Sequence, residues 1–289
     1  MSRFMLSYVK SNSPVHRLSG ATKIITFLLW SILAMTGYDT RVMLVMGAMA
    51  LFFFVISGVR FRDVSVIFKL LLLFMVLNFI AIYLFAPEQG VLIYGTRHLI
   101  AKGVGRYTIT AEQLFYEFNL FLKYLTLVPA GILLIVTIQP SEFAASLNRI
   151  GVPYTAAYAV SLCLRYIPDI QRDYENISQA QQARGIELSK KTSLLKRIKG
   201  SARILLPLIF SSLERIDVIS RAMELRGFGK NKKRTWYSFR PFTKKDAVVL
   251  AAAVLLFILG MWITFADGSR FYNPWIPKQV PTALAVSSI

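Results

Sequence analysis

The sequence has almost none of the residue types that bind metals or form disulfides. Cys163 is its only cysteine, which excludes an internal disulfide and a cysteine-rich metal site. The two histidines, His16 and His98, lie far apart and flank no obvious partner. Paired carboxylates within the predicted spans and a plausible nucleophile–base pair are also lacking. We therefore expect no metal site, no cofactor and no catalytic residue in this chain.

Acidic residues are scarce as well, at 15 against 34 lysines and arginines, which gives a net charge of +19. A chain this basic either binds nucleic acid or exposes basic loops on the cytoplasmic side of a membrane. The sequence has no RNP motif, no helix-turn-helix and no basic patch interleaved with aromatic residues. Hydrophobic residues make up 55% of it. These features favour the bilayer as a partner and argue against nucleic acid.

Long apolar runs predict an all-α polytopic membrane protein with about five transmembrane helices. The first run is short, and it reaches the length of a span if Lys23 extends its ammonium group to the interface. Thr110 followed by Gln113 marks the start of the helix that leads into the fourth span. The membrane domain is predicted over 1–138, with spans at about 21–38, 42–59, 64–85 and 119–138, and the fifth span at 246–266.

The basic residues also predict the orientation of the chain. The first 23 residues carry Arg3, Lys10, Arg17 and Lys23, and the segment 139–245 carries twenty of the 34 basic residues. Because cytoplasmic loops carry the excess of lysine and arginine, we expect a cytoplasmic N-terminus and an outside C-terminus. The loop 87–117 fits this orientation least well, because it is long and mildly basic. Its β-forming residues at 91–94 and 107–110 are compatible with a small hairpin. The tail, 267–289, contains three prolines and is expected to be loosely ordered.

The polar segment 139–245 is predicted to be a cytoplasmic domain of three helices between spans four and five. The first covers 154–166 and ends at Pro168, the second runs from Asp169 to Arg184, and the third covers 194–225 and bends at Pro207. We interpret an apolar stripe on the third helix as a core face packed on the second helix or on the membrane domain. Its members are Leu195, Ile198, Ala202, Leu205, Ile209, Leu213, Ile216, Ile219 and Met223.

Two of these helices end in nearly the same way, at Ala183-Arg184-Gly185 and at Leu225-Arg226-Gly227, with 42 positions between the arginines. One such end is explained by helix capping alone, because glycine suits the C′ position and arginine favours the negative helix end. An arginine at a helix end also donates forked hydrogen bonds to an acidic or carbonyl-lined groove. Two similar ends therefore suit a partner with two similar lobes.

Here the sequence resembles the T component, or transmembrane coupling protein, of energy-coupling factor transporters. The family carries two short Ala-Arg-Gly-like motifs on coupling helices, which correspond to 183–185 and 225–227. Most of 13–229 follows the same order of blocks, although Ser19-Gly20-Ala21 departs from the family's turn before Thr22-Lys23 and Leu225 replaces the alanine of the second motif. Other matching blocks are Ser13–Leu18, Thr137–Glu142, Leu147–Pro153, Leu164–Pro168 and Leu213–Phe228.

The resemblance implies a protein that links two cytosolic ATP-binding-cassette ATPases to a small substrate-binding membrane subunit, in the plasma membrane of a prokaryote. Arg184 and Arg226 would each enter a groove of one ATPase, and the motion would reach the substrate-binding subunit through the long third helix. The transported substrate would be a vitamin or a transition-metal ion. The chain has no G-x-x-x-x-G-K-[ST] motif, so it would be no enzyme, and ATP hydrolysis would come from the ATPases.

Two other functions stay open at this point, a self-contained transporter or channel and a membrane enzyme. The first would need polar or ionisable residues inside the spans. Only Asn78, Lys69 and Lys123 qualify. A lone asparagine in a span more often bonds a neighbouring helix than a substrate. The second would need a catalytic group, and neither Cys163 nor Ser161 has an evident base near it.

Overall fold

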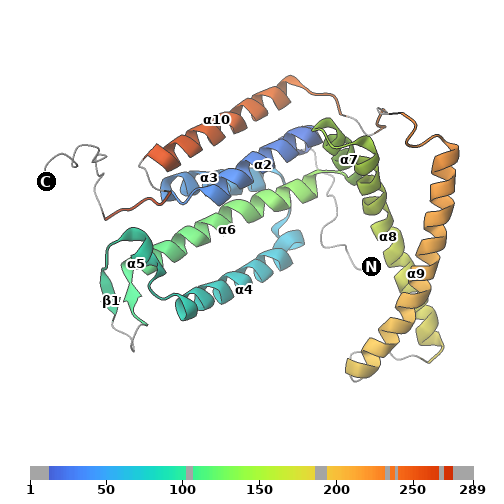
Figure 1. Ribbon diagram of the computed structural model, residues 1–289, viewed down its shortest axis with the longest axis horizontal. Helices are drawn as coiled ribbons and strands as arrows, with labels where there is room; N and C mark the ends of the chain where they lie inside the picture. The colour runs from blue at the N-terminus through green and yellow to red at the C-terminus, as the bar shows by residue number, and fades with distance from the viewer. Residues whose placement is uncertain are drawn as a thin grey trace, which may run out of the picture. The chain divides into compact units, whose positions relative to one another are not determined.

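The computed structural model describes residues 13–101, 107–185, 194–231, 235–237, 240–266 and 270–275. The chain divides into two compact units (Figure 1). Unit 1 consists of Met1–Gln139 and Pro241–Ile289, and unit 2 consists of Pro140–Arg240. Apart from one two-stranded sheet in unit 1, the described residues of both units are organised as helices.

Unit 1 contains the five long apolar helices that the sequence predicts, so the all-α polytopic membrane fold is confirmed. Three of them are long and apolar enough to cross a membrane, namely Val64–Phe85 within α4, α6 and α10. The other two, α2 and α3, are apolar but have only 17 residues each. The bounds are α2 Gly20–Thr36, α3 Thr40–Ile56, α4 Phe61–Phe85, α6 Ala111–Thr137 and α10 Lys244–Ala266, preceded by the short α1 Pro14–Arg17.

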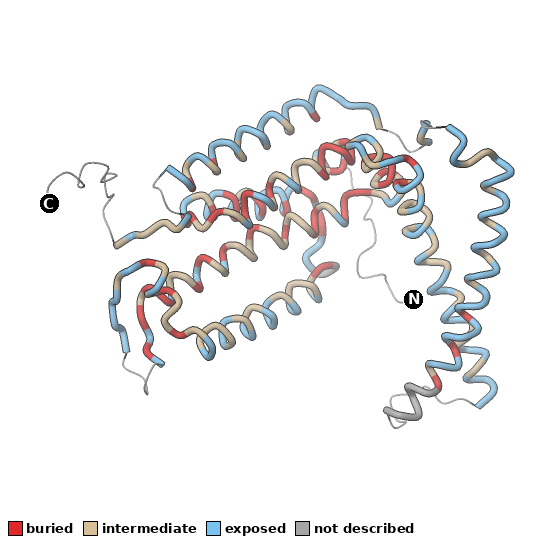
Figure 2. The backbone as a smooth tube through the Cα atoms, in the orientation of Figure 1, coloured by how far each residue is buried: buried red, intermediate tan, exposed pale blue. Residues whose placement is uncertain are grey.

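The core of unit 1 lies around α6, which packs on α3 and α2, while α10 packs on α2. One buried cluster includes Trp30, Leu33 and Met46, and a second joins α3, α4 and α6 through residues such as Phe54 and Ile132. The helix α4 contributes little to this core, and Figure 2 shows it intermediate to exposed along most of its length. An apolar helix that is exposed on most sides is suited to lipid or to another membrane protein.

Polar side chains bond the helix ends of unit 1 where α2 and α10 begin and α6 ends. Asp246 Oδ1 accepts a hydrogen bond from Ser19 N at 2.8 Å, and Lys23 Nζ donates to the Thr137 carbonyl oxygen at 2.9 Å. These bonds satisfy groups that a helix leaves without a partner at its ends. The expectation that Lys23 extends to the interface is wrong. Its residue is only 7% exposed, because the carbonyl at the end of α6 binds the ammonium inside the unit.

The opposite end of unit 1 carries a short helix and the small sheet, α5 Gln89–Tyr94, β1 Leu99–Ala101 and β2 Ile109–Thr110. A hairpin is therefore present, but residues 91–94 are helical and the first strand starts further along. The helix forms because Gly90 N donates to Gln113 Oε1 at 2.9 Å and Gly95, with φ +69°, ends it in the left-handed region. Thr110 caps α6 by accepting from Gln113 N, as the sequence predicts.

Part of the segment 267–289 is described, and it packs on this same end of unit 1. Tyr38 N donates to the Arg270 carbonyl at 3.1 Å, and the rings of Tyr38 and Phe271 lie 4.6 Å apart. Asn273 Nδ2 donates to the Tyr94 carbonyl at 2.9 Å. Burial raises the pKa of Tyr94 to about 12, so its hydroxyl stays neutral in this cluster. Residues 267–269 and 276–289 lie outside the described part of the chain.

Unit 2 contains α7 Pro140–Arg149, α8 Tyr154–Ala183 and α9 Leu194–Leu225. Three helices were expected, but the predicted break at Pro168 is wrong, because α8 continues through it. A proline inside a helix costs about 3 kcal/mol. The packing of α8 on α9 and on α7 outweighs this cost. Pro207 likewise lies inside α9.

The tight approach of α5 to α6 gives a testable prediction at Gly90. A Cβ atom there would lie 2.4 Å from the Glu112 carbonyl oxygen, which is backbone and cannot move aside alone. We expect Gly90→Ala to destabilise unit 1 by roughly 1–3 kcal/mol. The measurement is the temperature at which half of the detergent-purified protein loses its monodisperse size-exclusion peak. Gly131→Ala is the control, because a Cβ there would meet Phe27 at an ordinary 3.8 Å. Equal temperatures for both variants would contradict the packing described here.

Candidate functional site

The end of α9 is fixed by its own backbone around Gly227. The Gly227 N–H donates to the Glu224 carbonyl and the Phe228 N–H donates to the Met223 carbonyl, each at 2.9 Å. Together these bonds form a Schellman motif, which needs the left-handed conformation that Gly227 adopts with φ +67°. Arg226 is therefore the last residue before the reversal of the chain.

The end of α8 repeats this geometry as far as the structure describes it. Gly185 has φ +84°, and its N–H donates to the Gln182 carbonyl at 2.9 Å. Arg184 N donates to the carbonyls of Ala180 and Gln181. Both glycines therefore occupy the C′ position that the sequence predicts, and Arg184 and Arg226 occupy equivalent positions on their helices.

The two helices run in opposite directions and cross, as the interactions between them show (Figure 1). The start of α8 meets the end of α9, where the rings of Tyr154 and Phe228 lie 5.4 Å apart. Further along, Arg215 Nη2 donates to Asp173 Oδ2. Arg184 follows Asp173 by eleven residues, and Arg226 follows Arg215 by the same number. At a rise of 1.5 Å per residue, each arginine lies about 16 Å beyond the ion pair, in opposite directions.

An aromatic cluster holds the chain that leaves Arg226. The Phe228 ring lies 5.4 Å from Tyr154 and 4.9 Å from Tyr158. The Tyr154 hydroxyl accepts a hydrogen bond from Gly229 N. Trp236 joins the cluster next to Tyr158 and donates to Asn148 Oδ1 at 3.1 Å. These contacts attach the loop after α9 to α7 and to the start of α8.

The side chains at the two helix ends face outward. Ala183, Arg184, Gly185, Leu225 and Arg226 are exposed, and Gly227 is partly buried. Leu225 is 90% exposed, which is unusual for a large apolar side chain beside an arginine. An exposed leucine next to a guanidinium group offers apolar contact and forked hydrogen bonds at one point.

The apolar stripe expected on α9 is not a core face. Leu205, Ile209, Leu213 and Ile216 are each about half exposed. Figure 2 shows α9 exposed along most of its length. The fully buried position is shifted by one residue, to Ile204 and its neighbour one turn later, Leu208. The helical spacing correctly predicted a helix with apolar residues, but residues 204–210 are apolar on all sides of the helix, so spacing alone did not identify the packed side. Unit 2 therefore exposes a large apolar surface on α9.

The described residues contain no group of three or more histidine, cysteine, aspartate or glutamate side chains that could hold a metal ion. What unit 2 offers is two exposed guanidinium groups on capped helix ends and an exposed apolar surface between them. Five apolar helices in unit 1 define a polytopic membrane protein, and unit 2 adds two similar exposed arginine ends.

Comparisons with known proteins agree with this class. The family model CbiQ, described as cobalt transport protein, matches residues 11–237. The energy-coupling factor transporter transmembrane protein EcfT of Lactococcus lactis subsp. cremoris is 26% identical over 260 residues, which cover 87% of this chain and 94% of the relative. The EcfT of Heliobacterium modesticaldum is 29% identical with the same coverage. The EcfT of Bacillus subtilis is 24% identical over 257 residues, 86% of this chain and 93% of the relative.

The chain belongs to the CbiQ family of cobalt transport proteins. The resemblance to the T component of energy-coupling factor transporters is thereby confirmed. The protein is a multi-pass membrane protein and a component of a transport system.

Sequence reasoning missed the ion pair and the aromatic cluster that position the two ends. One signal was available for the ion pair, because Asp173 and Arg215 have the same 42-residue separation as Arg184 and Arg226. The aromatic cluster joins residues 148–158 to 228–236. No local pattern links such distant segments, so only the fold shows it.

The contacts of Phe228 predict how firmly the second helix end is held. Phe228→Ala removes two ring pairs, each worth about 0.5–1.5 kcal/mol beyond area burial. Transient opening of the end of α9 should therefore increase about tenfold, and with it the rate of trypsin cleavage after Arg226 under limiting protease. Tyr237→Ala is the matched control, since the Tyr237 residue is fully exposed. If both variants are cleaved at the same rate as the parent protein, the cluster does not hold this helix end.

Proposed function

We propose that this protein is the coupling subunit of an energy-coupling factor importer, and that it joins two cytosolic ATP-binding-cassette ATPases to a small substrate-binding membrane subunit. The observation that carries the proposal is the pair of arginine ends at equal distances from the Asp173–Arg215 ion pair. Two equivalent contact points on an antiparallel helix pair match a motor made of two similar ATPases.

Each arginine would bind one ATPase. Arg184 and Arg226 project from helix ends whose last turn is closed by glycine, so a groove can approach without meeting a side chain at the C′ position. A guanidinium group binds carboxylates and carbonyl oxygens through forked hydrogen bonds. Leu225, beside Arg226, would add apolar contact to the second site.

The ion pair and the packing between α8 and α9 would make the two ends move together. Asp173 and Arg215 are about one third exposed, and the buried Ile204 and Leu208 lie on α9 on the opposite side of the pair from its end. Closure of the ATPase pair would displace both arginine ends at once. The crossed helices α8 and α9 would then move together as one rigid body. The exposed apolar surface of α9, which includes Phe210 at 62% and Val218 at 68%, would contact the substrate-binding subunit.

The contacts of Lys23 and Lys123 argue against a self-contained transporter or channel. Lys23 donates to the Thr137 carbonyl at the end of α6, and Lys123 donates to the Met35 carbonyl near the end of α2 at 3.0 Å. Both charges therefore serve helix ends, where cations are favourable. Asn78 is partly buried on α4. A substrate path inside this chain would need further polar groups in the spans.

The transported substrate would be a vitamin or a transition-metal ion, bound by the partner subunit. Cobalt is the metal that the family description suggests. The basic residues of 139–245 and of the first 23 positions favour a cytoplasmic location for unit 2 and the N-terminus, where the ATPases would be. The C-terminus would lie outside, in the plasma membrane of a prokaryote.

Affinity purification of the tagged full-length chain from its native membranes tests the proposal. The parent protein is expected to bring down two cassette ATPases and one small membrane protein. Charge reversal at one arginine, Arg184→Glu or Arg226→Glu, should weaken ATPase recovery at least tenfold, because an unpaired buried charge replaces a forked bond. The double variant should lose both ATPases, because neither arginine site remains to hold an ATPase while the other binds.

The control is Arg172→Glu, which makes the same charge change on an exposed position of α8 twelve residues before the first end. It is expected to keep the ATPases and the uptake of substrate. A double variant that retains both ATPases and transports normally would refute the role of the arginine ends.

A further inference from the structure

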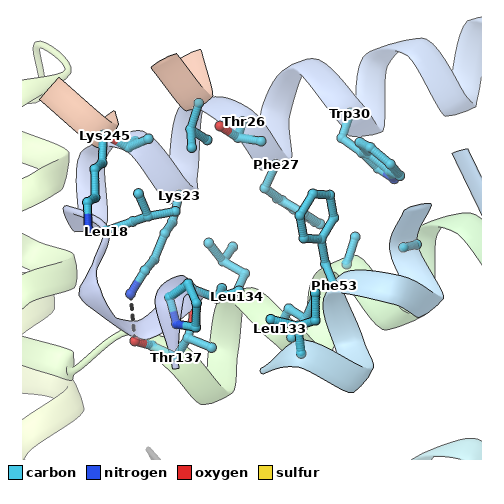
Figure 3. A pocket seen from close by; sticks show the side chains of 17 residues that line it. Leu18, Lys23, Thr26, Phe27, Trp30, Phe53, Leu133, Leu134, Thr137 and Lys245 are labelled. Carbon is cyan, nitrogen blue, oxygen red and sulfur yellow. Dashed lines mark hydrogen bonds between the residues drawn. The ribbon is translucent and has the colours of Figure 1, made fainter. Parts of the chain in front are cut away.

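Unit 1 contains a cavity of about 400 Å³ among α2, α3, α6 and α10, which Figure 3 shows from close by. Its volume falls within the range of sites for small molecules. Its lining is almost wholly apolar, with Phe27, Trp30, Phe53 and Leu133 among the side chains that face it. From Thr22 to Trp30 the cavity follows α2 for about 12 Å. An elongated apolar space of this kind suits a hydrocarbon chain.

One end of the cavity is basic. Lys245 lines it and is exposed, and Lys23 lines it from the start of α2. The ammonium group of Lys23 points to the Thr137 carbonyl, as the dashed line in Figure 3 shows, whereas Lys245 lies at the rim near Leu18. A long lysine side chain at the end of a span reaches the headgroup level of a bilayer. The cavity therefore combines an apolar interior with a cation at the level of lipid phosphates.

Two lining hydroxyls give independent support for a ligand. Thr26 Oγ1 and Thr137 Oγ1 are buried, and neither has a hydrogen-bond partner among the described residues. Thr137 is only 2% exposed, and it lines the cavity at the same end as the lysines. A buried hydroxyl without a partner is costly, so the site favours an occupant with an acceptor near its polar end. The ester carbonyl of a phospholipid is such an acceptor.

We propose that this cavity binds one acyl chain of an anionic phospholipid, with the phosphate of its headgroup on Lys245. The apolar lining accepts the chain, the Thr137 hydroxyl lies where the ester group would enter, and the lysine selects a negative headgroup. The lipid would fill the space between four helices at the end where α2 and α10 begin and α6 ends. A lipid bound there would contact all four helices and contribute to the packing of unit 1.

The first test measures which lipid the full-length protein retains. The purified protein is equilibrated with equal amounts of phosphatidylglycerol and phosphatidylcholine that carry identical acyl chains, and bound lipid is counted by native mass spectrometry. The parent protein should retain phosphatidylglycerol preferentially. Lys245→Gln should reduce the preference about fivefold, the factor that one lysine near anionic headgroups contributes.

Lys244→Gln is the matched control, because Lys244 is adjacent, exposed and equally charged but does not line the cavity. It should leave the preference unchanged. If Lys244→Gln and Lys245→Gln reduce it equally, the basic surface attracts lipid without a site, and the proposal fails. Retention of both lipids in equal amounts by the parent protein would overturn the choice of an anionic headgroup.

A second test places the acyl chain. Brominated acyl chains quench the fluorescence of a tryptophan in contact with them, and Trp30 lines the cavity whereas Trp262 is 69% exposed on α10. The Trp30 signal is obtained by difference from a Trp30→Phe variant. Brominated phosphatidylglycerol in lipid nanodiscs should quench Trp30, and the cavity-filling change Ala130→Leu should abolish this quenching while Trp262 is still quenched. Unchanged Trp30 quenching in Ala130→Leu would show that no chain enters the cavity.

Discussion

The helices of this protein depend on a partner for each of their ends. A helix leaves its first N–H groups and its last carbonyls without intrahelical bonds, and in an apolar environment no water replaces them. Asp246 therefore binds the start of α2, Lys23 binds the end of α6, and Lys123 binds a carbonyl near the end of α2. In unit 2 the glycines at the ends of α8 and α9 perform the same task through the backbone, and Arg184 and Arg226 beside them are exposed.

Local patterns predicted the parts of this fold that local physics decides. Apolar runs gave the five long helices, and Thr110, Gly185 and Gly227 were correctly predicted as helix ends. Contacts between distant segments were not predictable. The helix α8 passes through Pro168 because α9 and α7 pack on it, and residues 91–94 are helical because α5 docks against the start of α6. The arginine ends could be found by their repetition, and the ion pair shares their 42-residue separation, whereas the aromatic cluster joins distant segments that no local pattern links.

The two units use apolar surface in different ways. In unit 1 the exposed apolar side chains of α4 are what a bilayer requires. In unit 2 the exposed apolar side chains of α9 lie beside charged residues such as Asp217 and Arg221. Such a mixed surface is typical of a contact with another protein.

Each arginine follows its member of the ion pair by eleven residues. The number of residues in each segment therefore sets where the arginine lies along and around its helix. Each inserted residue between Asp173 and Arg184, or between Arg215 and Arg226, would move the arginine about 1.5 Å along the helix and turn it by about 100°. A single insertion of an uncharged helix-forming residue would thus turn the guanidinium group to another side of the helix while leaving charge and helicity unchanged. Substitutions along these two segments leave the arginines in place, whereas any change in the length of a segment moves its arginine along and around the helix.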